Sequence, residues 1–228
     1  MPASAIPHPF YPLGLSVPNY TPSQITMIET LAIFFSFVFA AMAVASFLIT
    51  RKTTDTATRL LFVWWVSCSM IHGIVEGYFA FTNGTIAGDQ TVLSAVWKEY
   101  AMSDSRYMTS DPFVVVMEGF TAVLWGPLSM IAAYLLYHSH PSRHLLQLII
   151  SCGQLYGLLI YYGTEIFEGF AHASPAFLHF YVYFWGFNFP WFVIPLLVIR
   201  SSGSVIIKAC TEFEGKGKAA GAKKVKKN

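Results

Sequence analysis

Charged side chains are scarce in this chain. Asp, Glu, Lys and Arg together make up 11% of its 228 residues, whereas hydrophobic residues make up 55%. Water-soluble domains carry about 25% charged residues, so the composition excludes an ordinary soluble domain. It favours a protein embedded in lipid, where one membrane-spanning helix needs about 20 consecutive, mostly apolar residues.

Cysteine is also sparse. The three cysteines, Cys68, Cys152 and Cys210, show no metal-ligand spacing. Their number and placement exclude a disulfide framework and a cysteine-based metal centre. Cys68 and Cys152 lie in apolar runs, and we expect both to behave as small buried hydrophobic residues.

Long apolar runs are what the sequence has in abundance. We predict an all-α, polytopic integral membrane protein, a bundle of five transmembrane helices at about residues 26–50, 60–82, 113–137, 143–166 and 176–200. The predicted domain organisation is an N-terminal segment (1–25), the five-helix domain (26–200) with a long loop (83–112), and a basic tail (201–228). We expect the tail to be disordered, because its lysines are interleaved with Gly and Ala.

The distribution of Lys and Arg predicts the orientation. The first 27 residues contain neither, Arg51, Lys52 and Arg59 follow the first span, and seven of the 14 basic residues lie in the last 21 positions. Under the positive-inside rule, the N-terminus and the 83–112 loop are then lumenal and the C-terminus is cytoplasmic. The final residues, Lys224–Asn228, resemble a di-lysine retrieval signal and predict an endoplasmic reticulum membrane.

Four polar residues interrupt the apolar runs: His72, Glu76, Glu118 and Asn188. Ionisable groups inside a membrane are costly and therefore mark functional sites by default. His72 and Glu76 stand four residues apart, on one helical face and within hydrogen-bonding reach. Such a pair suits acid–base chemistry, because the carboxylate orients the imidazole and stabilises its protonated form. A polar clasp between helices is the alternative.

Depth in the membrane brings these groups together. Glu76 lies about six residues before the lumenal end of the second span and Glu118 about six after the lumenal start of the third, so both carboxyl groups lie roughly 9 Å inside that edge. Asn188 reaches nearly the level of His72, and we expect the four groups to line one cavity. Two neighbouring carboxyl groups in low dielectric are not both ionised, so a proton donor and a proton acceptor can coexist. Trp191, one turn after Asn188, can stabilise a cation with its ring.

Several segments resemble a known family. Ile71–Phe79, Trp97–Tyr107, Met117–Pro127, Gln147–Gly157 and the N-terminal His8-Pro-Phe-Tyr-Pro12 closely resemble the emopamil-binding protein family, whose members include sterol Δ8→Δ7 isomerases of the endoplasmic reticulum. The resemblance covers nearly the whole chain except the tail. It implies a five-helix bundle around an intramembrane sterol cavity, a homodimer, and a reaction that needs no cofactor and no metal.

The resemblance also implies a reaction and residue roles. The ring double bond moves by protonation of carbon 9, a carbocation at carbon 8, and loss of a proton from carbon 7. Negative charge and π faces near the cavity would stabilise that cation. The acid and the base are left open. The implied catalytic residues are His72, Glu76, Glu118 and Asn188; the residues expected to bind substrate or stabilise the cation are Trp191, Thr121, Tyr107 and Trp185; and Asp104 and Arg106 are expected to hold the loop as a lumenal cap.

Partners and competing functions follow from the same residues. The expected partners are a Δ8-sterol, cationic amphiphilic amines that mimic the carbocation, and membrane lipid, with no nucleic acid. A non-catalytic sterol- or amine-binding membrane protein is the main alternative, although it would need fewer titratable groups. A proton-coupled transporter is a third class, disfavoured because five spans show no inverted repeat.

Overall fold

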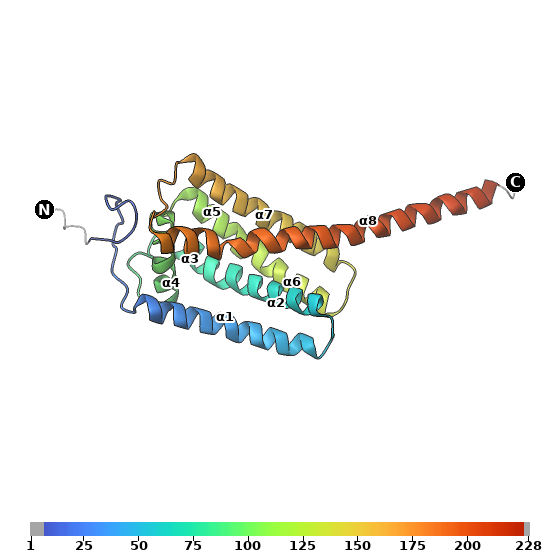
Figure 1. Cartoon of the computed structure of the whole chain (residues 1–228), viewed down its shortest axis with the longest axis horizontal. Coiled ribbons are helices and arrows are strands. Elements are labelled where there is room, and N and C mark those ends of the chain that lie inside the picture. The colour runs from blue at the N-terminus through green and yellow to red at the C-terminus, as the bar shows by residue number, and fades with distance from the viewer. Residues whose placement is uncertain (1–6, 226–228) are drawn as a thin grey trace.

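The structure is a computed structural model that describes residues 7–225, with side chains described for residues 7–216. Within these residues the regular elements are all helical. The prediction of five spans is confirmed, because five helical segments are long and apolar enough to cross a membrane: Met27–Thr50, Thr56–Thr82, Pro112–Tyr137, Arg143–Phe167 and Leu178–Lys216. Figure 1 shows them running back and forth along the long axis of the molecule.

Short polar sequences set where the spans begin. Helix α1 (Met27–Thr50) starts after Thr26, whose hydroxyl accepts from the backbone N–H of Glu29 while the Glu29 carboxylate accepts from the N–H of Thr26. This capping box satisfies two donors that a helix end leaves free. Asp55 caps α2 (Thr56–Met70) in a similar way, and Asp111 caps α5 (Pro112–Phe120).

Three spans contain π-helical turns. The second runs from α2 through η1 (Ile71–Glu76) into α3 (Gly77–Thr82), and the third runs from α5 through η3 (Thr121–Trp125) into α6 (Gly126–Tyr137). The fifth begins as η4 (Leu178–Phe187) and continues as α8 (Phe189–Val225), while α7 (Arg143–Phe167) is α-helical throughout. Turns of this kind occur frequently at functional sites.

Glycines allow two of these turns to touch. A Cβ atom on Gly126 would lie 3.0 Å from the backbone nitrogen of Gly73, in the middle of η1. Any side chain at residue 126 would therefore push the second and third spans apart, next to His72.

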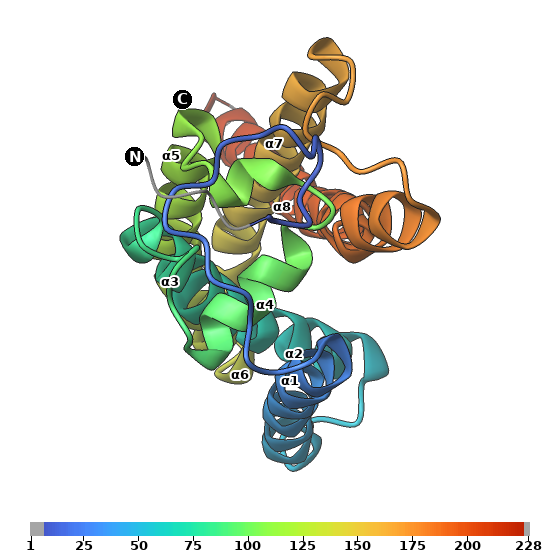
Figure 2. The same cartoon turned by 90° about the vertical axis from the view of Figure 1, so that its left-hand side faces the viewer.

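We call the end of the bundle that carries residues 83–111 the loop end, and the opposite end, with the turns 51–55 and 138–142, the turn end. The loop end contains an element that the sequence did not predict, helix α4 (Val92–Tyr100), followed by a 3-10 turn, η2 (Ser105–Met108). Trp97 of α4 stacks on Tyr107 of η2 with ring centroids 4.7 Å apart. The N-terminal segment crosses this end of the bundle (Figure 2) and buries Phe10 in the same aromatic cluster.

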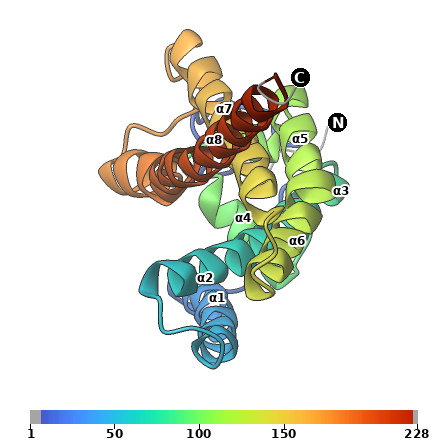
Figure 3. The same ribbon diagram turned by 90° about the vertical axis from the view of Figure 1, so that its right-hand side faces the viewer.

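A second apolar cluster closes the turn end of the bundle. It is built around Trp65 of α2, which is fully buried, with Ile49 of α1, Ala132 of α6 and Ile150 of α7. Viewed from this end, α1 and α2 lie to one side of α6, and α7 and α8 lie to the other (Figure 3).

Helix α8 is longer than expected. Its helical backbone continues past residue 200 to Val225, where we had expected a disordered tail, and it projects beyond the bundle (Figure 1). The segment 201–216 lacks proline and carries Val205, Ile206 and Ile207, so nothing in it ends the helix that arrives from the membrane. The last three residues of the di-lysine pattern and the first six residues of the predicted N-terminal segment lie outside the described part of the chain.

Candidate active site

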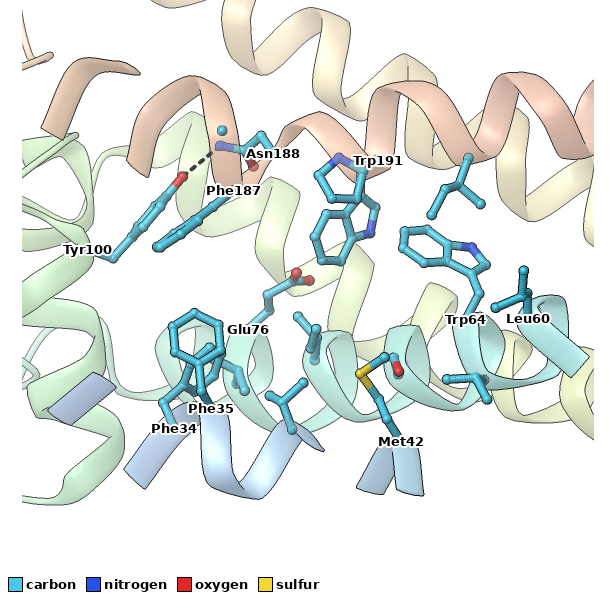
Figure 4. A pocket seen from close by; sticks show the side chains of 18 of the residues that line it. Phe34, Phe35, Met42, Leu60, Trp64, Glu76, Tyr100, Phe187, Asn188 and Trp191 are labelled. Atoms are coloured by element: carbon cyan, nitrogen blue, oxygen red, sulfur yellow. Dashed lines mark hydrogen bonds between the residues drawn. The ribbon is translucent and has the colours of Figure 1, made fainter. Parts of the chain in front are cut away.

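A large apolar cavity runs along the bundle between α1 and α2 on one side and η4 and α8 on the other (Figure 4). Its volume is about 1180 Å³, slightly above the range of about 300–1,000 Å³ for small-molecule sites. Leu60 and Leu197 line it and are also 67% and 60% exposed. Both lie within spans, so the cavity opens sideways toward the surface that faces lipid.

The predicted polar residues converge on this cavity, with one exception. Glu76, Glu118, Asn188 and Trp191 line it, and the Glu76 carboxyl group points into it below Trp191 (Figure 4). His72 is 3% exposed and is not part of the cavity wall. The imidazole therefore lies behind Glu76 as seen from the cavity.

The contact between His72 and Glu76 is direct. His72 Nδ1 lies 2.7 Å from Glu76 Oε2, and both residues belong to the π turn η1. The sequence predicted this pair from its spacing of four residues. The spacing did not predict that His72 lies outside the cavity wall while Glu76 is part of it.

Gln154 of α7 completes the histidine's surroundings, and we did not single it out from the sequence. Its amide nitrogen lies 2.9 Å from His72 Nε2, and the indole nitrogen of Trp191 donates to the same atom at 3.4 Å. Two donors at Nε2 assign the lone pair to that nitrogen, so the proton sits on Nδ1 and is donated to Glu76. The signal for Gln154 was present, since it is a polar residue inside an apolar span.

Glu118 is held by two hydroxyl groups. Tyr107 donates to its Oε1 at 2.6 Å, and Thr121 donates to its Oε2 at 3.3 Å and to its backbone carbonyl at 2.8 Å. Burial, together with the neighbouring Glu118 charge, raises the pKa of the Tyr107 hydroxyl, so Tyr107 remains a donor at neutral pH. The carboxyl groups of Glu118 and Glu76 belong to residues that line the same cavity.

Asn188 lines the cavity and is hydrogen-bonded toward the loop end. It lies between η4 and α8 and donates to the Tyr100 hydroxyl at 2.8 Å and to the Phe184 carbonyl at 2.7 Å. Tyr100 lies 3.5 Å from the hydroxyl of Tyr161, which donates to Asp104 at 2.7 Å. Asn188 is thus linked to the loop end, and it shares the cavity with Glu76 without contacting His72 through any hydrogen bond among the described residues.

Asp104 and Arg106 fasten the loop to α7. The two are 0% and 2% exposed and form an ion pair at 2.7 Å, and Arg106 also donates to Thr164 at 2.8 Å. Neither residue lines the cavity. The loop is therefore packed into the bundle by buried charges rather than solvated.

Trp185 lies away from the cavity. Its ring packs against Tyr162 with centroids 4.3 Å apart, and it is not among the cavity's lining residues. The expectation that it binds substrate finds no support in this position. Tyr107, by contrast, lines the cavity. Thr121 does not line it, but its hydroxyl donates to Glu118, which does.

One group of side chains has the spacing of a metal site. Ligand atoms of Glu165, Glu168 and His172 lie within 4.8 Å of one another. The buried Glu165 carboxylate already accepts from the backbone N–H groups of His172 and Ala173, and it lies 3.5 Å from Arg106. These bonds explain the cluster as an anchor for the loop end.

Comparisons with known proteins place this site in a family. Residues 92–202 match the EXPERA (EXPanded EBP superfamily) family. A 3-beta-hydroxysteroid-Delta(8),Delta(7)-isomerase from Cavia porcellus is 39% identical over 193 residues, which cover 82% of this chain and 84% of that protein. A probable enzyme of the same name from Oryza sativa is 36% identical, covering 92% and 95%. The chain belongs to the EBP family.

This membership confirms the resemblance that the sequence motifs indicated. The family match contains Glu118, Gln154, Asn188 and Trp191, whereas η1 with His72 and Glu76 precedes it. A protoglabretal synthase from Citrus sinensis is also similar, with 33% identity over 69% of this chain and 75% of its own length.

Proposed function

We propose that this EBP-family chain is a sterol Δ8→Δ7 isomerase that moves a ring double bond inside the membrane. The observation that carries the proposal is that two carboxyl groups, Glu76 and Glu118, face one apolar cavity that opens toward lipid. A sterol is a rigid apolar substrate dissolved in the bilayer, and it can reach such a cavity without crossing water. The names of the curated relatives support the same reaction.

The two carboxyl groups supply the proton chemistry. Because both face one low-dielectric cavity, they hold one proton between them, so one can protonate carbon 9 while the other accepts the proton from carbon 7. Tyr107 and Thr121 donate to Glu118, and His72 donates to Glu76, so hydrogen bonds support negative charge on both residues. That charge, together with the Trp191 ring on the cavity wall, stabilises the carbocation at carbon 8.

His72 acts through Glu76 in this scheme. Its imidazole is separated from the cavity by the carboxyl group, to which Nδ1 is hydrogen-bonded at 2.7 Å. After Glu76 has given its proton to the substrate, His72 passes its Nδ1 proton to the carboxylate as Nε2 takes up another proton, and the reverse transfer resets the pair. His72 is therefore a proton reservoir, and the groups that touch the reacting carbons are the carboxyl groups.

The remaining partners and the location are part of the proposal. A cationic amphiphilic amine should bind in the cavity, because its charge mimics the carbocation beside Glu76 and Glu118. We place the protein in the endoplasmic reticulum membrane with the loop end lumenal and α8 extending into the cytoplasm, as the Lys and Arg distribution favours. We also propose that it forms a homodimer, as the resemblance implies.

Turnover in deuterated water tests the reaction. Membranes containing the wild-type chain should convert a Δ8-sterol to its Δ7 isomer with deuterium at carbon 9. Glu76→Gln keeps the shape of the side chain and should lower turnover by roughly 10²-fold or more, the usual size of a general acid–base contribution. His72→Ala should also lower it.

Glu168→Gln is the matched control, because Glu168 is exposed at the loop end and should tolerate the same substitution. Binding of a radiolabelled cationic amine checks that each variant is folded. Wild-type protein that binds the sterol and the amine yet leaves the double bond in place would contradict the proposal and identify a binding protein.

A further inference from the structure

One face of α7 is polar along the half of the helix that leads from the turn end to the site. His144, Gln147, Ser151 and Gln154 follow one another at intervals of three, four and three residues, which places them on the same side of the helix. Gln147, Ser151 and Gln154 are 1%, 0% and 5% exposed, and His144 is partly buried. At about 1.5 Å per residue the row is roughly 15 Å long.

Each of the four side chains has one buried polar atom without a hydrogen-bond partner among the described residues: His144 Nδ1, Gln147 Nε2, Ser151 Oγ and Gln154 Oε1. Helix α7 lies between α6 and α8 (Figure 3), and both neighbours add polar groups. Ser129 of α6 also has a buried hydroxyl without a partner, and Ser202 of α8 donates to Gln147 at 3.3 Å. Five unpaired atoms thus lie on two helices that pack together.

Buried polar atoms in proteins are nearly always paired, either with protein or with ordered water. Internal waters bind where several unpaired polar groups meet, and dry cavities are lined by apolar atoms. A row of unpaired donors and acceptors about one helical turn apart is therefore a site for bound water and not a dry cavity. It is the spacing at which water molecules bridge successive side chains.

The row begins at the proton reservoir of the site. Gln154 contacts His72 Nε2, the nitrogen that faces away from Glu76, and His144 lies in the first turn of α7, beside Arg143. The Gln154 amide suits either protonation state of the histidine. Its NH₂ group donates to a bare Nε2, and its carbonyl oxygen accepts from a protonated Nε2 after rotation. While the amide rotates, a water molecule of the file takes its place at Nε2 and delivers or removes the proton.

We propose that a file of buried water molecules, held by His144, Gln147, Ser151 and Gln154, carries protons between His72 and the water at the turn end of the bundle. This inference rests on the proposed isomerase function. No net proton is consumed, because each turnover adds one to carbon 9 and releases one from carbon 7. The file therefore determines where the added proton comes from, solvent or the previous substrate.

A broken file would leave the catalytic proton trapped. Glu76, Glu118 and His72 would then hand the proton taken from carbon 7 of one sterol to carbon 9 of the next. The product formed in deuterated water would carry mostly ordinary hydrogen at carbon 9, even while turnover continued. A purely structural role for the polar row would change stability or rate without changing this isotope ratio.

The experiment compares Ser151→Val with Ser151→Thr in deuterated water. Valine and threonine have the same shape, and only threonine keeps a hydroxyl for the file. We expect the deuterium content of the product at carbon 9 to fall several-fold in Ser151→Val and to stay near the wild-type value in Ser151→Thr. Cys152→Val, on the adjacent exposed position, should also behave as wild type.

Gln147→Met removes the amide of the second residue in the row with little change in size. It is the variant to use if valine or threonine at residue 151 prevents the protein from folding. A Ser151→Val or Gln147→Met product as fully deuterated as the wild-type product would overturn the inference. Failure of the proposed isomerase function would give a different result, because the wild-type protein itself would then form no Δ7 product.

Discussion

The hydrogen bond from Tyr107 to Glu118 offers the sharpest test of whether charge on Glu118 takes part in the reaction. Tyr107→Phe deletes one oxygen atom and keeps the ring that stacks on Trp97 at 4.7 Å. The deleted hydroxyl donates to Glu118 at 2.6 Å, and both residues are buried. The substitution therefore removes one of the two side-chain donors that support charge on Glu118, and leaves Thr121 as the other.

The size of the effect follows from the kind of bond. A hydrogen bond to a charged group contributes about 1.5–3 kcal/mol. At about 1.36 kcal/mol for each factor of ten in rate, the loss corresponds to roughly 10- to 150-fold slower turnover if Glu118 carries its charge at the transition state. A decrease in turnover of this full size is expected only if Glu118 acts directly on the reacting sterol ring.

The assay is conversion of a Δ8-sterol by purified protein in detergent or in vesicles, at equal amounts of folded protein. Amine binding and the thermal unfolding midpoint report on folding. Tyr156→Phe makes the same change on an exposed position of α7 and should leave turnover unaltered. Turnover of Tyr107→Phe within twofold of wild type, with normal amine binding, would refute a role for charge on Glu118.

Two further substitutions test the surroundings of the cavity. Asp104→Asn should destabilise the protein by up to about 3 kcal/mol, because the buried Arg106 loses its carboxylate partner at 2.7 Å and keeps only the Glu165 carboxylate at 3.5 Å. A lower unfolding midpoint would be measured, and an unchanged midpoint would contradict the anchoring role. Trp185→Phe should leave the Michaelis constant for sterol nearly unchanged, since the ring packs on Tyr162 outside the cavity wall, and a large increase would restore Trp185 as a substrate contact.

The sequence was most informative about features that depend on local pattern. Apolar run length predicted the five spans, because the thickness of the hydrocarbon layer fixes the length of a spanning helix. The spacing of His72 and Glu76 predicted their contact, because residues four apart on a helix meet whatever surrounds them. Neither conclusion required knowledge of how the helices pack.

Features that depend on packing between distant segments were not predictable in this way. Gln154 is separated from His72 by 82 residues. It differs from the other polar residues of the spans only in that the packing of the helices brings it into contact with His72. The same holds for Tyr107 and Glu118, which meet because the unpredicted helix α4 and the turn η2 fold over the loop end. Composition alone could not distinguish that packed cap from a solvated loop.

The π turns explain why facing directions were hardest to predict. The four polar residues predicted inside the spans all lie in or close to one: His72 and Glu76 in η1, Glu118 three residues before η3, and Asn188 directly after η4. A π turn takes more residues than an α turn, so every later side chain in the span points in a different direction from the one that a regular helical period gives. The contact of Asn188 with Tyr100 follows the fifth span's π segment, and the depth of Asn188 in its span did not predict that partner. The same turns lie where Gly126, directly after η3, packs on Gly73 of η1. The irregularity that defeats the periodic prediction thus accompanies the approach of the two spans whose carboxyl groups line one cavity.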